Sequence, residues 1–407
     1  DGFKELLESE HWDIVPGGKY YVTRNNTSIL AFKVGTKLDN YSFNIVTSHT
    51  DSPTFKVKEN AEIEVKNKYT QLNTEGYGGM LCATWLDRPL SIAGRVLVSE
   101  GNSIVTKLLN IDRDLLMIPN VAIHMNRAAN DGFKYNLQVD MLPLLSGGDD
   151  RQKDFKQIIA DELGVKKEDI LGHDLYLYNR MAPSIWGANE EFISAGHLDD
   201  LQCGFASLKA LLAGYNDESI DIMACFDNEE VGSGTKQGAD STLLRDTLIR
   251  INNALGKTEE DYHRALASSF MLSADNAHAV HPNHPEHTDV TNCTYMNEGV
   301  VVKSHAGQKY TSDGVSMAVV KSLASGADVP LQYFANRSDK AGGSTLGNIA
   351  MAQASMNAVD IGLPQLAMHS SYETAGIKDT YYAIALMKAL FDSHIQETST
   401  HSLEIKR

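Results

Sequence analysis

Histidine and carboxylate side chains follow apolar, strand-like runs of this sequence at five separate places. The adjacent pair Glu229 and Glu230 is the most demanding, because two like charges repel and are costly to bury unless a cation compensates them. The five groups are His49 and Asp51 after YSFNIVTS (41–48), His197, Asp199 and Asp200 after EEFISAG (190–196), Asp227, Glu229 and Glu230 after DIMACF (221–226), Asp275 after FMLSA (270–274), and His369 after PQLAM (364–368).

Neutral imidazoles and carboxylates without thiolates are the donors that suit Zn²⁺, Mn²⁺ or Co²⁺. Two ions that share a bridging carboxylate need about five protein ligands plus water. A set with the right number and types is His49, Asp199, Glu230, Asp275 and His369. One glutamate of the adjacent pair, Glu229, is then left to handle a proton, and Asp51 can orient the His49 imidazole by a hydrogen bond.

Ligands of open α/β sheets bind just beyond the carboxyl ends of the strands, so these residues require such a sheet. Strand-like runs alternate with helix-like runs, which predicts an α/β fold with helices on both faces of a sheet. The expected strands are 20–25, 28–35, 41–48, 221–226, 269–275 and 364–370. The expected helices are 199–215, whose N-terminus Asp199 or Asp200 can cap, 312–326, 345–356 and 380–396.

Residues 57–190 have a different character, with strand-like pieces such as LSIAGRVLVSE (90–100) and few helix signals. We interpret them as a β-rich insertion. The predicted organisation is therefore a discontinuous catalytic domain of residues 1–56 plus 191–407, interrupted by an inserted domain of residues 57–190.

The bulk composition excludes some partners. The net charge of −17 argues against binding to nucleic acid or to an anionic membrane, since both need a basic face. The sequence contains no apolar run of about 18 residues that could cross a membrane. The N-terminal stretch has no apolar signal core, and the four cysteines are widely spaced. These features predict reduced thiols and a cytoplasmic location.

Two motifs are discounted at this point. HAVHPNHPEH (278–287) carries four histidines three residues apart, but we expect Pro282 and Pro285 to exclude a helix that would stack them. We interpret His278 and His281 as structural groups near Asp275. GGSTLGNIA (342–350) lacks the lysine of a phosphate-binding loop, and the sequence has no Gly-x-Ser-x-Gly motif of a serine hydrolase.

Seven stretches together resemble the family of aspartyl aminopeptidases and vacuolar aminopeptidase I, with their bacterial relatives. They are TSHTDSP (47–53), GYGG (76–79) with TWLDRPLSIAGRV (84–96), IPNVAIHMNR (118–127), GHLDDL (196–201), DNEEVGS (227–233), SADNAHAVHPN (273–283) and PQLAMHS (364–370). They span nearly the whole chain in the family's order. The resemblance implies a co-catalytic two-metal enzyme, most often with zinc, that removes N-terminal residues from peptides through a three-layer α/β/α metallo-exopeptidase domain.

The same resemblance implies a role for each matching residue. Asp199 would bridge the two metals, His49 and Asp275 would complete one site, and Glu230 and His369 the other. Glu229 would be the general base, with Asp51 behind the ligands. The insertion would serve as a dimerisation domain within a dodecamer, and His124 would reach a neighbouring subunit's active site and help to hold substrate.

An N-terminal aspartate or glutamate of the substrate needs a cation in its pocket. The acidic-specific members of the family use a lysine and a nearby tyrosine, which Lys303 and Tyr310 match. The alternative for Lys303 is a solvated lysine on an edge strand. Rival functions are a leucine or broad-specificity aminopeptidase of the same family, a di-metal deacylase or carboxypeptidase, and a scaffold that has lost its chemistry.

Overall fold

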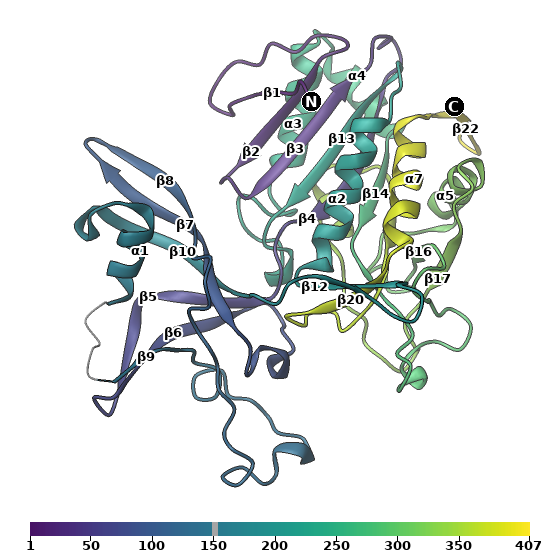
Figure 1. Ribbon diagram of the computed structural model, residues 1–407. Helices are drawn as coiled ribbons and strands as arrows, with labels where there is room; N and C mark the ends of the chain where they lie inside the picture. Colours follow the sequence, from purple (N-terminus) through teal and green to yellow (C-terminus); the bar gives the residue numbers. More distant parts are fainter. Residues whose placement is uncertain (149–153) are drawn as a thin grey trace. The chain divides into compact units, whose positions relative to one another are not determined.

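Residues 1–148 and 154–407 are described by the computed structural model, in which the chain forms two units (Figure 1). The first consists of Asp1–Asp51, Ile185–Met368 and Glu373–Arg407, and the second of Ser52–Ser184 and His369–Tyr372. The long segment of the second unit begins at residue 52 rather than 57 and ends at 184 rather than 190. A short return at 369–372, which the sequence pattern does not indicate, also belongs to it.

The first unit is built on a nine-stranded mixed sheet. Its four central strands, β13, β4, β14 and β18, run parallel to one another. β4, β13 and β14 are buried at every position, as is typical of parallel strands covered on both faces. In spatial order the strands are β1 (Lys4–Glu5), β2 (Lys19–Arg24), β3 (Ser28–Val34), β13 (Ser219–Phe226), β4 (Ser42–His49), β14 (Phe270–Ala274), β18 (Asn357–Gly362), β16 (Val300–Lys303) and β17 (Leu331–Phe334).

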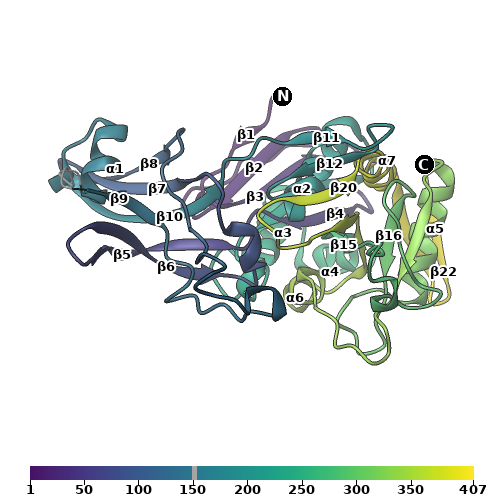
Figure 2. The ribbon, with the colours of Figure 1, turned by 60° about the horizontal axis from the view of Figure 1, so that its bottom comes forward.

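Helices cover both faces of this sheet, as the alternation predicts. Successive side chains of a strand point to opposite faces, so Phe43 and Ile45 of β4 join one core and Val46 joins the other. The first core is closed by α3 (Leu243–Ala254), α4 (Glu259–Ala267) and α6 (Leu346–Gln353), which Figure 2 shows on one side of the sheet. The second is closed by α2 (Leu198–Ala213), α5 (Gly314–Gly326) and α7 (Asp379–Phe391).

Smaller sheets complete the first unit. One has the order β11 (Ser184–Trp186), β12 (Phe192–Ala195), β20 (Glu373–Gly376), β19 (Pro364–Leu366) and β15 (Ala277–His278). The other is a hairpin of β21 (His394–Ser399) and β22 (Ser402–Lys406). The helix expected over 380–396 therefore ends at Phe391, because the alternating segment that follows pairs as β21 and buries Ile395. The strand expected over 364–370 ends at Leu366.

The second unit is a six-stranded antiparallel sheet with its own core. Trp85 stacks edge-on against Phe55 at the centre of that core, and Ile92, Leu175 and Phe155 pack with them. The spatial order is β8 (Ser103–Asn110), β7 (Leu90–Glu100), β10 (Ile170–Asn179), β5 (Thr54–Val65), β6 (Tyr69–Tyr77) and β9 (Leu144–Gly147), with α1 (Phe155–Leu163) packed on it. This unit is β-rich, with one α-helix among its described residues.

Candidate metal centre

The parallel register of the central strands brings three of the predicted groups to one edge of the sheet. His49 is the last residue of β4 and lies opposite Phe226, the last residue of β13. Glu229 begins the 3₁₀ turn η4 (Glu229–Val231) just after β13, and Asp275 directly follows β14. The carboxyl ends of these strands therefore converge, at the position where open α/β sheets bind ligands.

The His49 imidazole is buried and held from both sides. Its Nδ1 lies 3.0 Å from the main-chain carbonyl oxygen of Asp51, so Nδ1 carries the proton and donates it. Its Nε2 lies 3.4 Å from Oδ1 of Asp199. In the neutral ring this leaves the Nε2 lone pair facing the carboxylate cluster, which is the arrangement a metal-binding histidine requires. Burial acts to lower the pKa of His49, but Asp199 and the other carboxylates around it hold that pKa well above its usual value.

Two consecutive aspartates at the start of α2 face His49. The main-chain N–H of Asp199 donates to Oε2 of Glu373 at 3.0 Å, and Oδ2 of Asp200 accepts the His49 main-chain N–H at 3.2 Å. Both carboxylates are buried, and His197, just before them, has a left-handed backbone with φ of 61°. Asp200 is absent from the ligand set predicted from sequence. Nothing in the Asp-Asp motif says which of the two side chains turns inward.

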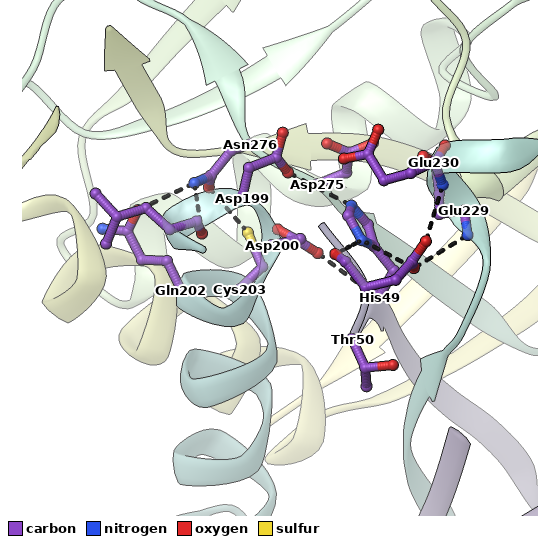
Figure 3. Close-up of polar contacts among 12 residues, drawn as sticks. His49, Thr50, Asp199, Asp200, Gln202, Cys203, Glu229, Glu230, Asp275 and Asn276 are labelled. Carbon is purple, nitrogen blue, oxygen red and sulfur yellow. Dashed lines mark hydrogen bonds and ion pairs between the residues drawn. The ribbon is translucent and has the colours of Figure 1, made fainter. Parts of the chain in front are cut away.

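Asp51 connects the His49 segment to the glutamate pair. Its carboxylate oxygens accept the main-chain N–H groups of Glu229 and Glu230, each at 3.1 Å, and one of them lies 3.5 Å from Nδ1 of His49. Asn228, just before the pair, is left-handed with φ of 63°, and its Oδ1 accepts hydrogen bonds from two side chains of the next turn. Figure 3 shows Glu229 and Glu230 beside His49. The carboxylate of Asp51 thus fixes the main-chain positions of both glutamates.

Asn276 ties the start of α2 to the end of β14. Its side-chain amide donates to the carbonyl oxygen of Leu198 at 3.1 Å and to Oε1 of Gln202 at 3.1 Å, and its Oδ1 accepts from Sγ of Cys203 at 3.3 Å (Figure 3). These contacts fix Asp199 relative to Asp275. Sequence reasoning missed this role, and the only signal was the asparagine that directly follows Asp275.

Lys303 lies in the interior strand β16 and is only 3% exposed, so it is not a solvated edge lysine. Its Nζ donates to the main-chain oxygen of Asn276 at 2.8 Å and lies 3.6 Å from Oδ1 of Asp275. The ring of Tyr310, also buried, is 5.7 Å from Nζ. Burial acts to lower the pKa of Lys303, but Asp275 together with Tyr310 and the other carboxylates nearby holds that pKa above its usual value.

Burial and mutual repulsion dominate the electrostatics of the cluster. Burial raises the pKa of Glu230 to about 9, with Asp199 as the next cause, and raises the pKa of Glu229 to about 7, with Asp275 as the next cause. Burial likewise raises the pKa of Asp200 and of Asp275. Carboxylates gathered in this way need a compensating cation.

The donor set fits a divalent metal. The ligand atoms of His49, Asp199, Asp200 and Asp275 lie within 4.8 Å of one another, and so do those of His49, Glu229 and Glu230. Imidazole nitrogen and carboxylate oxygen are the donors of zinc sites in proteins. The first unit thus brings together His49, Asp199, Glu229, Glu230 and Asp275, with Asp51 behind them.

Two predicted residues lie in the second unit. His369 has a left-handed backbone with φ of 68°, and its Nδ1 donates to the carbonyl oxygen of Gly79 at 2.9 Å. A metal bound by His369 would therefore use Nε2. His124 is exposed, in a turn closed by the Met125 N–H donating to the Ala122 oxygen at 2.8 Å.

Comparisons with known proteins agree with this chemistry. The M18 family model, described as aminopeptidase I zinc metalloprotease, matches residues 1–391. A relative named "Probable M18 family aminopeptidase 2" from Clostridium novyi is 47% identical over 398 residues, which cover 96% of this chain and 92% of the relative. A relative with the same name from Stutzerimonas stutzeri is 39% identical over 398 residues, covering 96% and 91%.

Solved structures give the same fold. A chain from the "Cryo-EM structure of the Ape4 and Nbr1 complex" is similar with a TM-score of 0.93 and 35% identity, covering 96% of this chain and 80% of that one. A chain from the "Structure of S. cerevesiae mApe1 dodecamer" has a TM-score of 0.82 and 28% identity, covering 96% and 89%. Among the described residues, no helix is both long and apolar enough to span a membrane.

Proposed function

The chain belongs to the aminopeptidase I (M18) family of zinc metalloproteases, and we propose that its aminopeptidase reaction takes place at the cluster around His49 with two divalent ions, zinc in the first place. The observation that carries the proposal is the convergence of the buried His49, Asp199 and Asp275 at one edge of the sheet, with the half-buried Glu230 beside His49. Ions bound there would supply the Lewis acidity that peptide hydrolysis needs.

The proposed ligands divide into two groups that share Asp199. His49 and Asp275 would hold one ion, and Glu230 and His369 would hold the other. The cluster of His49, Asp199 and Asp275 supports the first group. His369 follows β19 by three residues, and the Nδ1 bond to Gly79 leaves Nε2 as its ligand atom. Mn²⁺ and Co²⁺ prefer similar donors and are the alternatives in the add-back experiment below.

Glu229 is proposed as the general base and acid. It takes a proton from the attacking water and returns it to the leaving amine, so one carboxylate serves both halves of the reaction. The main-chain N–H of Glu229 donates to Asp51, so the backbone from which the Glu229 side chain projects is held in place. A free α-amino group of the substrate would lie among the acidic groups of the cluster, which would select N-terminal residues.

A preference for N-terminal aspartate or glutamate is a second candidate for the substrate class. The observation that favours it is a buried cation, Lys303, beside Asp275 and 5.7 Å from the ring of Tyr310. Asp275 already compensates that charge. We propose that the main role of Lys303 is to hold Asp275 in place, and that it also contributes positive charge to the pocket for the substrate's N-terminal side chain. A leucine or broad preference is the alternative, and the test below separates the two.

The proposed assembly is a homo-oligomer, a dodecamer built from dimers, with residues 57–190 as the dimerising part and His124 as a contact to a neighbouring subunit's substrate. The dodecamer of the yeast relative supports this. Large apolar side chains exposed in the second unit are compatible with it, since apolar side chains gathered into a patch mark interfaces. They include Ile104, Leu108, Val121, Ile123, Met125 and Val139. The four free cysteines support a reducing compartment, the cytoplasm.

The test is hydrolysis of aspartyl-, glutamyl- and leucyl-p-nitroanilide and of one N-acetylated peptide, after chelation and after adding back Zn²⁺, Mn²⁺ or Co²⁺. We expect chelator-sensitive release from free N-termini alone. Release from the blocked peptide would instead support a deacylase, and no release with any metal would support an inactive scaffold.

The base assignment is tested with Glu229→Gln, and the exposed Glu10→Gln is the matched control. We expect Glu229→Gln to lose activity by about 10²-fold or more, because general acid–base catalysis contributes about 10²–10⁴-fold. Its bound metal, measured by elemental analysis, should stay unchanged. Near-full activity of Glu229→Gln would show that another group moves the proton.

A further inference from the structure

Three histidines of the loop that follows β15 are aligned on one side of the chain. The ring centroids of His281 and His284 are 5.5 Å apart, and those of His284 and His287 are 5.3 Å apart. The prolines exclude an α-helix, as the sequence predicts, but they do not prevent stacking. Pro285 opens the 3₁₀ turn η5 (Pro285–His287), and in that geometry side chains three residues apart lie one above the other.

The three-residue spacing of the histidines in 278–287 therefore matches the three-residue hydrogen-bond spacing of the backbone. The N–H of His284 donates to the His281 carbonyl oxygen at 3.0 Å, and the N–H of His287 donates to the His284 carbonyl oxygen at 3.1 Å. The chain thus makes two successive turns of three residues. The expectation that the prolines keep these rings apart was wrong, because it considered only the α-helical spacing.

Glu286 completes a set of metal donors. Its Oε1 lies 3.1 Å from Nδ1 of His284 and 4.0 Å from Nε2 of His287. The ligand atoms of these three residues all lie within 4.8 Å of one another. Two donors bound to one zinc ion at about 2.1 Å lie at most about 4.2 Å apart, so a small side-chain rotation is enough. The side chains of His284 and His287 are 59% and 63% exposed and can make that rotation.

His281 supports the set without joining it. Its Nδ1 accepts the main-chain N–H of Asn283 at 3.2 Å, so the proton of the neutral ring is on Nε2. That ring cannot offer a lone pair to a metal without losing this bond. Its ring lies beside the ring of His284 instead.

The backbone of the loop is held in place before any ion binds. The guanidinium of Arg337 donates to the carbonyl oxygen of Glu286 and is itself fixed by two bonds of 2.8 Å to Asp339. The hydroxyl of Thr288 donates to the Pro285 carbonyl oxygen at 2.8 Å. A preformed backbone reduces the entropy lost when ligands gather around an ion.

We propose that His284, Glu286 and His287 form an accessory surface site for a borderline divalent metal of the Zn²⁺, Ni²⁺ and Cu²⁺ class, separate from the catalytic cluster. Two imidazoles and one carboxylate are the protein donors of known zinc sites in which water completes the coordination. A single carboxylate is too few for Mg²⁺ or Ca²⁺, which prefer all-oxygen sites. The site neither uses nor depends on the catalytic ligands.

The experiment compares three full-length, untagged proteins after removal of metal by a chelator. They are the wild type, the double variant His284→Ala/His287→Ala, and His263→Ala as the matched control. His263 is an exposed histidine beside a glutamate, with Nε2 3.9 Å from Oε1 of Glu259, but among the described residues it belongs to no group of three metal donors. Zn²⁺ bound per chain is measured by equilibrium dialysis, and retention on immobilised Ni²⁺ is measured in parallel.

We expect the double variant to bind one zinc ion fewer per chain than the wild type and to lose retention on immobilised Ni²⁺. His263→Ala should behave as the wild type in both measurements. Hydrolytic activity with saturating Zn²⁺ should be the same in all three proteins, which separates this site from the catalytic centre. Equal zinc content of the double variant and the wild type would overturn the proposal. So would a double variant that is less thermostable but has unchanged zinc content, because the histidines would then only stabilise the loop.

Discussion

Replacing Gly362 with alanine should disable the metal centre while the chain stays folded. Gly362 ends β18, and a Cβ built there would lie 2.1 Å from the main-chain oxygen of Asp275, 3.0 Å from Cε of Lys303 and 3.1 Å from the main-chain nitrogen of Ala277. Real Cβ atoms essentially never approach other atoms closer than 3.0 Å, so the Asp275 backbone would have to move by about 0.9 Å.

The size of the effect follows from that displacement. A misplacement of about 1 Å in a catalytic constellation costs about 10²-fold in rate, which corresponds to about 2.7 kcal/mol. Overpacking itself costs about 1–3 kcal/mol of stability, which a chain with this much core should tolerate. Asp275 cannot easily yield elsewhere, because its main-chain N–H is bonded to the Ile361 oxygen at 3.1 Å and its carboxylate lies beside Lys303.

The matched control is Gly314→Ala at the first position of α5, where an added Cβ meets nothing within 4 Å. The assay measures kcat on the best p-nitroanilide, zinc affinity by chelator competition, and the thermal midpoint. We expect Gly362→Ala to lose about 10²-fold in kcat and to release zinc more readily, with Gly314→Ala unchanged. Activity of Gly362→Ala within about twofold of the control would refute the argument that the packing of Asp275 against β18 fixes its position.

Three further predictions concern groups around and away from the centre. Asp51→Asn keeps one acceptor oxygen for two main-chain N–H groups, so zinc retention in chelator competition should fall by about 10–100-fold; retention equal to wild type would contradict the orienting role of Asp51. Lys303→Met leaves the buried Asp275 without its cation, so hydrolysis of the leucyl substrate should fall, and any additional loss on aspartyl and glutamyl substrates measures a contact with their side chains; unchanged activity on all three would exclude both roles. Burial lowers the pKa of His394, so the unfolded chain binds a proton there that the folded chain does not. The stability that His394 contributes should therefore fall as pH drops below about 6.5, by at most about 1.4 kcal/mol per pH unit. Between pH 7.5 and 5, the thermal midpoint of His394→Gln should depend less steeply on pH than that of the wild type. Parallel plots of thermal midpoint against pH for the two proteins would contradict this.

The sequence contained enough to predict the strands at the centre of the sheet and the polar residues that follow them, because those features depend on local patterns. Unbroken apolar runs predicted β4, β13 and β14, and the polar residues after them marked the strand ends. Helices α3 and α4 were not predicted, although the apolar residues of α3 at 243, 244, 248 and 251 have helical spacing. That signal was present in the sequence and was missed.

Other features were not readable because they depend on contacts between distant segments. The inward turn of Asp200 depends on a left-handed His197 and on the main-chain N–H of His49. The hydrogen bonds of Asn276 depend on α2, because one of its partners, Gln202, is 74 residues away in the sequence. The stacked histidines were misinterpreted for a different reason. The motif has a period of three, and only the α-helical period was considered.

Strand register is the physical link between the two motifs that matter most for the proposed chemistry. Asp51 and Glu229 are 178 residues apart in the sequence, yet the Asp51 carboxylate accepts the main-chain N–H groups of Glu229 and Glu230 at 3.1 Å. That contact exists only because β4 and β13 pair with His49 opposite Phe226. A slip of one residue would move the partners by about 3.3 Å, beyond hydrogen-bond range, and would turn every β4 side chain to the opposite face. The two cores that pack Ile45 and Val46 on opposite faces of β4 oppose such a slip. The geometry of the metal centre is therefore set by the apolar core beneath it as much as by the polar residues that form it.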